Sequence, residues 1–207
     1  MKLLVFGASG PTGRLIVADA LAAGHRVTAF ARRAATVFQK GVAVACGDAL
    51  DAGAVGAAVA GHEAVICALG VRSAHESPHL LERSLGAIVP AMQAAGARRL
   101  VVLSALGVGG TRAQAPLLPR LMYRLLLGTI FRDKAAGEAI VVASSLDWTL
   151  VYPPLLTNDP AQGACRAGET LALTGFPKIA RTDVARFMVD TLSSTAWVRR
   201  RVLVSSA

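Results

Sequence analysis

Three glycines near the start of the chain, Gly7, Gly10 and Gly13, have the spacing of a turn that binds phosphate groups. They follow the apolar run 3–6, which indicates a buried strand, and precede the amphipathic stretch 14–23, which indicates a helix. Backbone N–H groups at a helix start lack intrahelical partners and carry the positive end of the helix dipole, so they can receive a pyrophosphate. We therefore predict a dinucleotide site; the alternative is a strand-to-helix turn that binds nothing.

The small residues of this turn have separate roles in the expected site. Gly7 permits the tight turn, Gly10 lets the backbone approach the phosphates, and Gly13 lets the helix pack closely on the strand. Pro11 occupies a first-turn position, where its missing N–H would have had no partner.

The end of the next apolar run indicates which dinucleotide binds. The run 26–31 is rich in strand-forming residues and ends at Arg32 and Arg33, about 25 positions after Gly7. Near this place, NAD sites carry an acidic side chain for the ribose 2′-hydroxyl, whereas NADP sites carry a guanidinium for the 2′-phosphate. A guanidinium suits that task because its fork of donors matches phosphate oxygens. Positions 30–33 hold no carboxylate, so the sequence favours NADP(H) over NAD(H); the alternative is an arginine pair in a solvated loop.

Strand-like and helix-like segments alternate almost to the end of the chain. This order predicts an α/β fold with a Rossmann-type, doubly wound parallel sheet, formed by one compact domain (1–207) with small C-terminal additions on the substrate side. Asp51 and Gly96 are expected to cap helices. The expected strands cover 3–6, 26–31, 42–46, 63–68, 98–104, 147–151, a short segment near Leu171, and 202–204; the expected helices cover 14–23, 51–60, 80–95, 117–144 with a break near 128–129, and 182–192. Two glycine-containing loops, 106–119 and 153–168, are candidate lids.

Composition excludes several classes of protein. The chain has 207 residues, of which 54% are hydrophobic and 17% charged, and this balance excludes a disordered chain. No apolar run reaches the roughly 18 residues that a membrane helix needs, and the opening apolar residues are too few for a signal peptide. We therefore expect a protein that does not bind a membrane, and the cysteine content considered next indicates a reducing cytoplasm.

Charge and cysteine content narrow the expected partners. The net charge is +9, but the arginines are scattered and not interleaved with aromatic residues, so we expect no nucleic-acid partner. Phosphates of a cofactor account for part of the excess charge. The three cysteines are odd in number and lack metal-ligand spacing, so we expect no metal site. Of these, Cys46 and Cys67 fall at strand ends and are expected to be buried, whereas Cys165 lies in a predicted loop.

Four stretches together resemble one superfamily: GASGPTGR (7–14), GHRVTAFAR (24–32), GDAL (47–50) and SLDWTLVYP (145–153). They are similar to the atypical short-chain dehydrogenases/reductases. Within that superfamily the chain resembles the NAD(P)-binding, NmrA-like group that includes the flavin reductase/biliverdin reductase B type. The resemblance covers essentially the whole chain.

The resemblance, together with the rule that ligands bind beyond the carboxyl ends of parallel strands, assigns candidate residues. It places the pyrophosphate on the glycine turn, the 2′-phosphate on Arg32, the adenine at Asp48 and Ala49, and the nicotinamide between Ser104 and the segment after 151. The candidate cofactor-binding residues are Gly7, Ser9, Gly10, Pro11, Thr12, Gly13, Arg14, Arg32, Asp48, Ala49, Leu69, Gly70, Arg72, Ser104, Pro153, Pro154 and Leu155. The candidate catalytic residues are Ser104, Lys134 and Tyr152. For Ser104, the alternative is a strand-end serine that bonds only to backbone.

Two departures from the family pattern bear on the reaction. Many short-chain dehydrogenases use a Tyr-x-x-x-Lys pair, but the residue four before Lys134 is Ile130, which cannot transfer a proton. Tyr123 lies about three helical turns from Lys134 and does not replace it. The flavin-reductase type carries a histidine after its two prolines, where this chain has Leu155.

These departures favour a reaction that needs little acid–base chemistry. A flavin or quinone takes hydride directly from a reduced nicotinamide, so positioning supplies most of the catalysis. We expect an NADPH-dependent reductase of a small planar acceptor, acting as a monomer or weak homodimer. The apolar stretch 117–130 and the loop after Pro154 are expected to supply the acceptor pocket. The alternatives are a non-enzymatic NmrA-like redox sensor and an NAD(P)-dependent epimerase or dehydratase.

Overall fold

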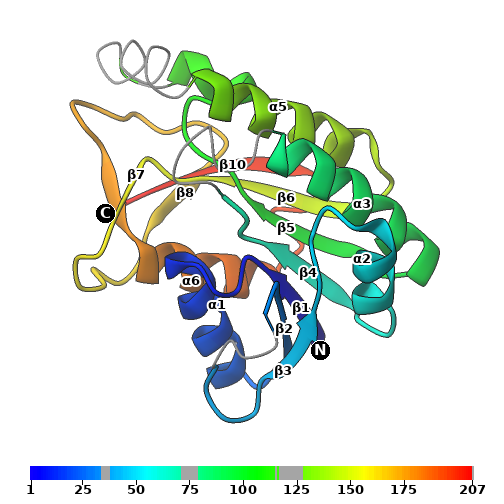
Figure 1. Cartoon of the computed structure of the whole chain (residues 1–207). Coiled ribbons are helices and arrows are strands. Elements are labelled where there is room, and N and C mark those ends of the chain that lie inside the picture. Colours follow the sequence, from blue (N-terminus) through cyan, green and yellow to red (C-terminus); the bar gives the residue numbers. More distant parts are fainter. Residues whose placement is uncertain (34–37, 71–78, 115, 117–127, 207) are drawn as a thin grey trace.

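The chain forms an eight-stranded sheet in the order β3-β2-β1-β4-β5-β6-β10-β8 (Figure 1). The computed structural model describes residues 1–33, 38–70, 79–114, 116 and 128–206. All neighbouring strands are parallel except β8, which pairs antiparallel with β10. The strands are β1 (Lys2–Phe6), β2 (Arg26–Ala31), β3 (Ala43–Cys46), β4 (Ala64–Cys67), β5 (Arg99–Leu103), β6 (Asp147–Tyr152), β8 (Arg166–Gly168) and β10 (Arg200–Ser205). This confirms the predicted Rossmann-type sheet, with its order reversing between β1 and β4.

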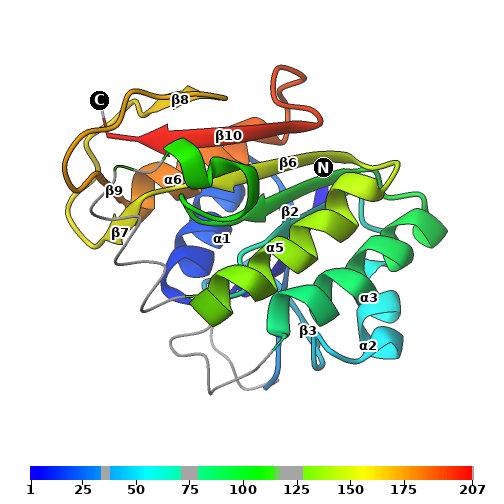
Figure 2. The ribbon, with the colours of Figure 1, turned by 90° about the horizontal axis from the view of Figure 1, so that it is seen from above.

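Helices cover both faces of the sheet (Figures 1 and 2). Of the helices in the described part of the chain, two pack together on one face and three cover the other. The first pair is α1 (Pro11–Ala22) and α6 (Arg181–Thr191); the other three are α2 (Ala52–Val59), α3 (Leu80–Ala95) and α5 (Gly128–Ala143). A 3₁₀ helix, η1 (Gly109–Gln114), and a two-stranded parallel sheet of β7 (Leu155–Thr157) and β9 (Lys178–Ala180) complete the described fold.

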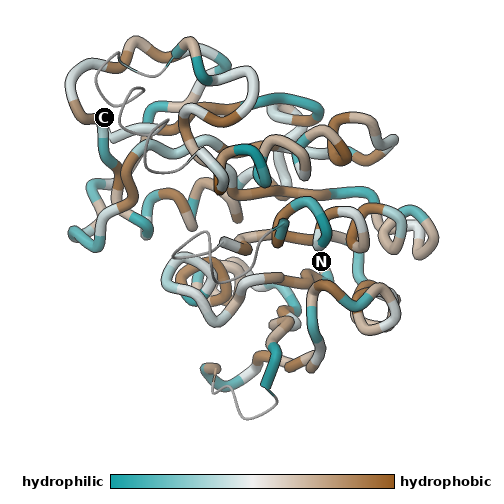
Figure 3. The backbone as a smooth tube through the Cα atoms, turned by 45° about the horizontal axis from the view of Figure 1, so that its top comes forward, coloured by the Kyte–Doolittle hydropathy of each residue, from teal (hydrophilic) through white to brown (hydrophobic). Residues whose placement is uncertain are grey.

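The central strands carry apolar residues on both faces because helices cover both. The tube is accordingly brown over much of the middle of the molecule in Figure 3. In β1, Leu4 and Phe6 point to the side of α2, α3 and α5, whereas Leu3 and Val5 point to the side of α1 and α6. All four side chains are completely buried. Among the described residues, no helix combines the length and apolarity needed to cross a bilayer.

Local sequence signals located several helix ends correctly. Helix α3 has the predicted bounds and is followed by Gly96 in the left-handed conformation, at φ 72°. Asp51 caps α2, where its Oδ1 accepts from the N–H groups of Gly53 and Ala54 at 2.8 and 3.3 Å. Helix α1 begins at Pro11, which confirms the expected first-turn position of this proline, and Gly10 is its N-cap.

Other predictions were wrong where tertiary position decides the outcome. No strand forms at Leu171; β8 lies earlier, at Arg166–Gly168, where it pairs with β10. Cys46 is exposed because β3 is an edge strand, whereas Cys67 is buried as predicted. The loops 106–119 and 153–168 contain regular structure, namely η1, β7 and β8. Arg72, Tyr123 and the predicted helix over 117–127 lie outside the described residues.

Helix α3 is capped from another helix. Its N-cap residue, His79, makes no side-chain capping bond, and Asp133 on α5 takes over that role. The Asp133 oxygens accept from the N–H groups of Leu81 and Glu82 at 3.0 and 2.9 Å. These bonds satisfy two donors at the helix start and join α5 to α3.

We expect Asp133→Ala to lower the free energy of unfolding by about 2–3 kcal/mol, because it leaves two backbone donors without a charged acceptor. The local cap variant Asp51→Ala should cost only about 1 kcal/mol, since its site is open to water. Urea unfolding of both variants measures the difference. Equal losses would contradict the interhelical role of Asp133.

Candidate functional site

The glycine turn after β1 is sterically restricted to glycine at two positions. Gly7 has φ 75°, and a Cβ atom there would lie 2.5 Å from the carbonyl oxygen of Ala68. A Cβ atom on Gly13 would collide with the carbonyl oxygen of Gly7. The N–H of Gly10 donates to that same oxygen at 3.0 Å and closes the turn. Strand β1 thus enters α1 through a backbone that leaves no room for larger residues.

The first turn of α1 fits an anionic ligand. Gly10 caps the helix without a side chain, and the first turn carries no acidic residue. Its backbone donors are among those that lack intrahelical acceptors, at the positive end of the helix dipole. Arg14 adds positive charge: its Nε donates to the Ser9 carbonyl at 3.3 Å, and its guanidinium lies 5.6 Å from the centre of the Phe38 ring. These residues fit the pyrophosphate of a dinucleotide.

The predicted adenine side lies at the ends of β2 and β3. Arg32 directly follows β2 and is exposed, as is Asp48 two residues after β3. The Asp48 Oδ1 accepts from the N–H of Leu50 at 3.0 Å. Ala49 packs in the core beside Phe30, so only its backbone is available to a ligand. At the end of β4, Leu69 is half-buried and Gly70 is exposed.

A buried carboxylate links the ends of β5 and β6. Glu138 on α5 is 4% exposed, and it accepts hydrogen bonds from two hydroxyl groups. Ser104 Oγ donates to Oε1, and the Tyr152 hydroxyl donates to Oε2 at 2.8 Å. The Ser104 N–H also donates to the Val151 carbonyl at 2.8 Å, which ties the two strand ends together. Two predicted catalytic residues therefore meet on a glutamate that the sequence analysis missed.

Lys134 lies one helical turn before Glu138 on α5. Its Nζ donates to the carbonyl of Leu103, the residue before Ser104, at 3.3 Å. Burial lowers the pKa of Lys134, and electrostatic interactions with Cys67, Glu138 and Asp133 oppose that change. The lysine thus reaches the carboxyl end of β5, and its catalytic role stays a prediction. The Lys-x-x-x-Glu spacing, which places both side chains on one helix face, was the available signal for Glu138.

Tyr152 lies at the end of β6, with its hydroxyl group against Glu138. Its side chain is completely buried, and burial together with the neighbouring Glu138 raises its pKa far above the ordinary value. The Tyr152 hydroxyl is thus held as a donor to Glu138, and its direct catalytic role stays a prediction. Pro153 and Pro154 are also buried, whereas Leu155 is 58% exposed.

One group of potential metal ligands occurs among the described residues. A nitrogen of His79 and oxygens of Glu82 and Asp133 lie within 4.8 Å of one another. His79 pairs with Glu82 at 2.8 Å, and both Asp133 oxygens accept from the backbone of α3. Helix capping explains this group without an ion.

The sheet and its glycine turn define a dinucleotide-binding protein of the Rossmann type. A model of the NAD(P)H-binding family matches residues 7–195, so the chain belongs to that family. An uncharacterized chloroplastic protein of Arabidopsis thaliana is 30% identical over 173 residues, which cover 78% of this chain and 61% of that relative. The chain thus spans less than two thirds of the length of this relative.

Solved structures share the fold over almost the whole chain. ChuY from Escherichia coli, described as an anaerobillin reductase, superposes with a TM-score of 0.84 at 24% identity, covering 100% of this chain and 97% of ChuY. A short-chain dehydrogenase/reductase from Veillonella parvula in complex with NADP gives a TM-score of 0.83 at 20% identity, covering 99% and 94%. These structures share the fold, and the family match shows an NAD(P)H-binding protein. The expected short-chain dehydrogenase/reductase superfamily and its NmrA-like group stay predictions.

Proposed function

We propose that this protein is an NADPH-dependent reductase of a planar acceptor such as a flavin or quinone. One observation carries the proposal: the glycine turn lies at the same edge of the sheet as the carboxyl ends of β5 and β6 (the reaction edge), where the one tyrosine among the described residues, Tyr152, is buried against Glu138. Ile130 stands four residues before Lys134, where a Tyr-x-x-x-Lys pair has its tyrosine. The hydroxyl group of Tyr152 donates a hydrogen bond to Glu138. NADPH, when bound, supplies the hydride.

This edge suits an acceptor that needs positioning more than acid–base activation. Oxidation of an alcohol requires a base that removes the hydroxyl proton, and the raised pKa of Tyr152 prevents it from serving as one. Conjugated rings take hydride when they are held face to face with the donor, so placement accounts for most of the rate. This reasoning also counts against an epimerase or dehydratase.

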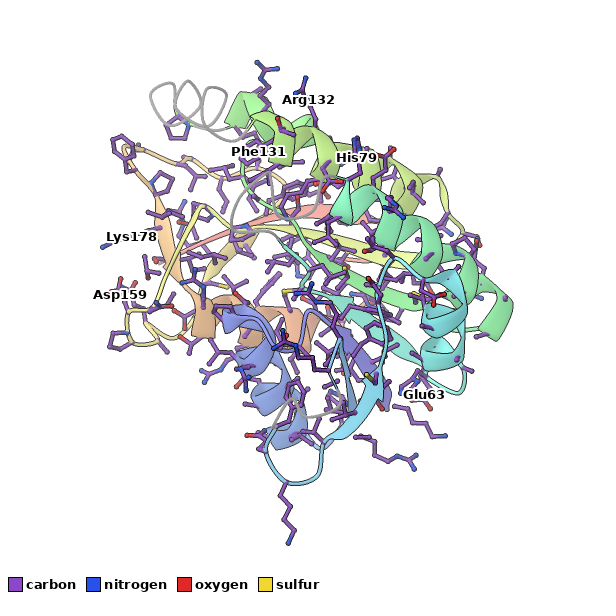
Figure 4. The ribbon with its side chains drawn as sticks, viewed as in Figure 1. Glu63, His79, Phe131, Arg132, Asp159 and Lys178 are labelled. Atoms are coloured by element: carbon purple, nitrogen blue, oxygen red, sulfur yellow. The ribbon has the colours of Figure 1, made fainter. Side chains whose placement is uncertain are left out.

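An acceptor site is supported by a hollow at the carboxyl edge of the sheet. The hollow has a volume of about 310 Å³, and its lining includes Phe176 and two basic residues, Arg166 and Lys178. Phe176 and Leu155 are each 58% exposed, and the Leu155 N–H donates at 3.3 Å to the carbonyl of Pro177, the residue after Phe176. Lys178 lies beside Asp159, with 4.0 Å between Nζ and Oδ2 (Figure 4). A lining that combines Leu173 and Phe176 with two basic side chains favours a planar ring that carries acidic substituents.

The proposal is tested by mixing the protein with NADPH and a panel of free flavins and quinones. We expect at least one acceptor to accelerate NADPH oxidation by more than about tenfold over the reaction without protein. Nicotinamide absorbance measures the rate, and calorimetry measures NADPH binding separately.

NADPH binding without acceleration by any acceptor would contradict the reductase proposal. Comparable affinities for NADP⁺ and NADPH in that case would favour the redox sensor instead.

A further inference from the structure

We infer that Glu138 is a positioning residue that switches Ser104 between accepting and donating a hydrogen bond, and so controls proton delivery to the acceptor. This inference rests on the proposed reductase function. It concerns the one buried carboxylate that joins both reaction-edge strands among the described residues.

The surroundings of Glu138 fix its carboxylate in one orientation. Ser104 bonds to one oxygen and Tyr152 to the other, so the two strand ends hold the group from both sides. Gly109 passes directly over it: a Cβ atom on Gly109 would lie 2.8 Å from Oε2. The carboxylate therefore has little freedom to turn away from Ser104 when its charge changes.

Counting protons shows why the charge of Glu138 matters to Ser104. When Glu138 is ionised, Ser104 and Tyr152 each donate their only hydroxyl proton to it. The side of the Ser104 Oγ atom that faces away from Glu138, here called its outward side, then offers only lone pairs. These accept a hydrogen bond from a group such as an amide N–H. When Glu138 is protonated, its own proton is donated to Ser104 Oγ, and the Ser104 proton turns outward to a ligand. One proton on Glu138 thus reverses the hydrogen-bonding direction of Ser104.

Charged groups face Glu138 from several elements. Burial raises its pKa, while the hydroxyls of Ser104 and Tyr152 and the positive charges of Lys134 and Arg201 act in the opposite direction. Lys134 comes from α5 itself and Arg201 from β10, on the far side of β6. Because burial is the largest effect, the protonated form persists to higher pH than for an exposed glutamate.

The resulting step is balanced in atoms and electrons. A hydride, with two electrons, passes from NADPH to the acceptor, so NADPH is oxidised to NADP⁺ and the acceptor is reduced. An acceptor heteroatom takes the outward proton of Ser104, and Ser104 takes the proton of Glu138. Solvent then returns one proton to Glu138, so each turnover consumes NADPH, one acceptor and one H⁺.

The test compares the pH dependence of kcat in the wild type, Glu138→Gln and Tyr152→Phe, from about pH 5 to about pH 9. In the wild type, kcat should fall as Glu138 ionises. Glu138→Gln keeps a neutral side chain of the same shape but cannot give up a proton, so that decline should disappear and kcat at low pH should drop about 10- to 100-fold. Tyr152→Phe removes a bond that stabilises the carboxylate, so the decline should move to higher pH.

A matched control is Glu63→Gln, which makes the same chemical change on an exposed residue. Glu63 accepts from the Lys2 N–H at 2.9 Å at the amino edge of the sheet, far from α5 (Figure 4). The Glu63→Gln substitution should leave the pH dependence of kcat unchanged. A Glu138→Gln profile that keeps the wild-type decline, with or without a lower rate, would overturn the inference.

Infrared difference spectroscopy separates this inference from the proposed function. If no acceptor is reduced, the protonated carboxyl band of the wild type should still titrate, vanish in Glu138→Gln and shift to higher pH in Tyr152→Phe. A band unaffected by both substitutions would overturn the inference. Should Glu138→Gln fail to fold, the shift in Tyr152→Phe decides the question alone.

Discussion

Replacing Gly13 with alanine should abolish useful binding of NADP(H), with the dissociation constant rising by more than about a hundredfold, or about 2.7 kcal/mol. The added Cβ atom collides with the Gly7 carbonyl oxygen and lies 2.9 Å from the Cα atom of Ala8. These are backbone atoms, so no side-chain rotation relieves the clash. The turn must open and move the first N–H groups of α1 away from the pyrophosphate.

Calorimetric titration with NADPH measures the loss, and Gly56→Ala is the matched control. Gly56 lies within α2, and a Cβ atom there meets nothing within 4 Å. Alanine at that position should leave binding unchanged and stabilise the helix by about 0.5–1 kcal/mol. Because the Gly13 clash also costs about 1–3 kcal/mol of stability, thermal unfolding must confirm that the variant is folded during titration. Wild-type affinity in folded Gly13→Ala would remove the glycine turn from the site.

The glycine turn was predictable because all its determinants lie within a few residues of one another. Gly7, Gly10 and Gly13 each act on the backbone of the same short segment, so their spacing carries the geometry. The central strands were predictable for a related reason: continuous apolar runs form only where both faces of a strand are covered.

Glu138 was not predictable in the same way. Its partners lie 34 residues earlier and 14 residues later, and only the pairing of β5 with β6 brings Ser104 and Tyr152 together. A glutamate within a helix is usually a solvated residue, so its burial follows from the packing of α5 and not from its type. The exposure of Cys46 likewise depends on β3 being the outermost strand, which strand propensity does not reveal. Strands β7 and β9 have three residues each, too few for a recognisable pattern.

Arg32→Asp should reverse the preference from NADP⁺ to NAD⁺. The dissociation constant of NADP⁺ divided by that of NAD⁺ should rise by about 100- to 1,000-fold. The arginine is exposed directly beyond β2, where the ribose of a bound dinucleotide lies in this fold. Its loss removes a charged hydrogen bond worth about 1.5–3 kcal/mol from NADP⁺ alone. The new carboxylate repels the 2′-phosphate and accepts from the 2′-hydroxyl of NAD⁺.

Titration of Arg32→Ala with both nucleotides separates these two contributions, since alanine removes the bond without adding a negative charge. Alanine should weaken NADP⁺ by about 10- to 100-fold and leave NAD⁺ nearly unchanged. Arg26→Asp makes the same charge change at the opposite end of β2, where the residue is also exposed. That control should alter both affinities equally and only slightly, because the charge lies beyond the screening length of ordinary salt. Equal losses of NADP⁺ and NAD⁺ in Arg32→Ala would show that the arginine does not contact the 2′-phosphate.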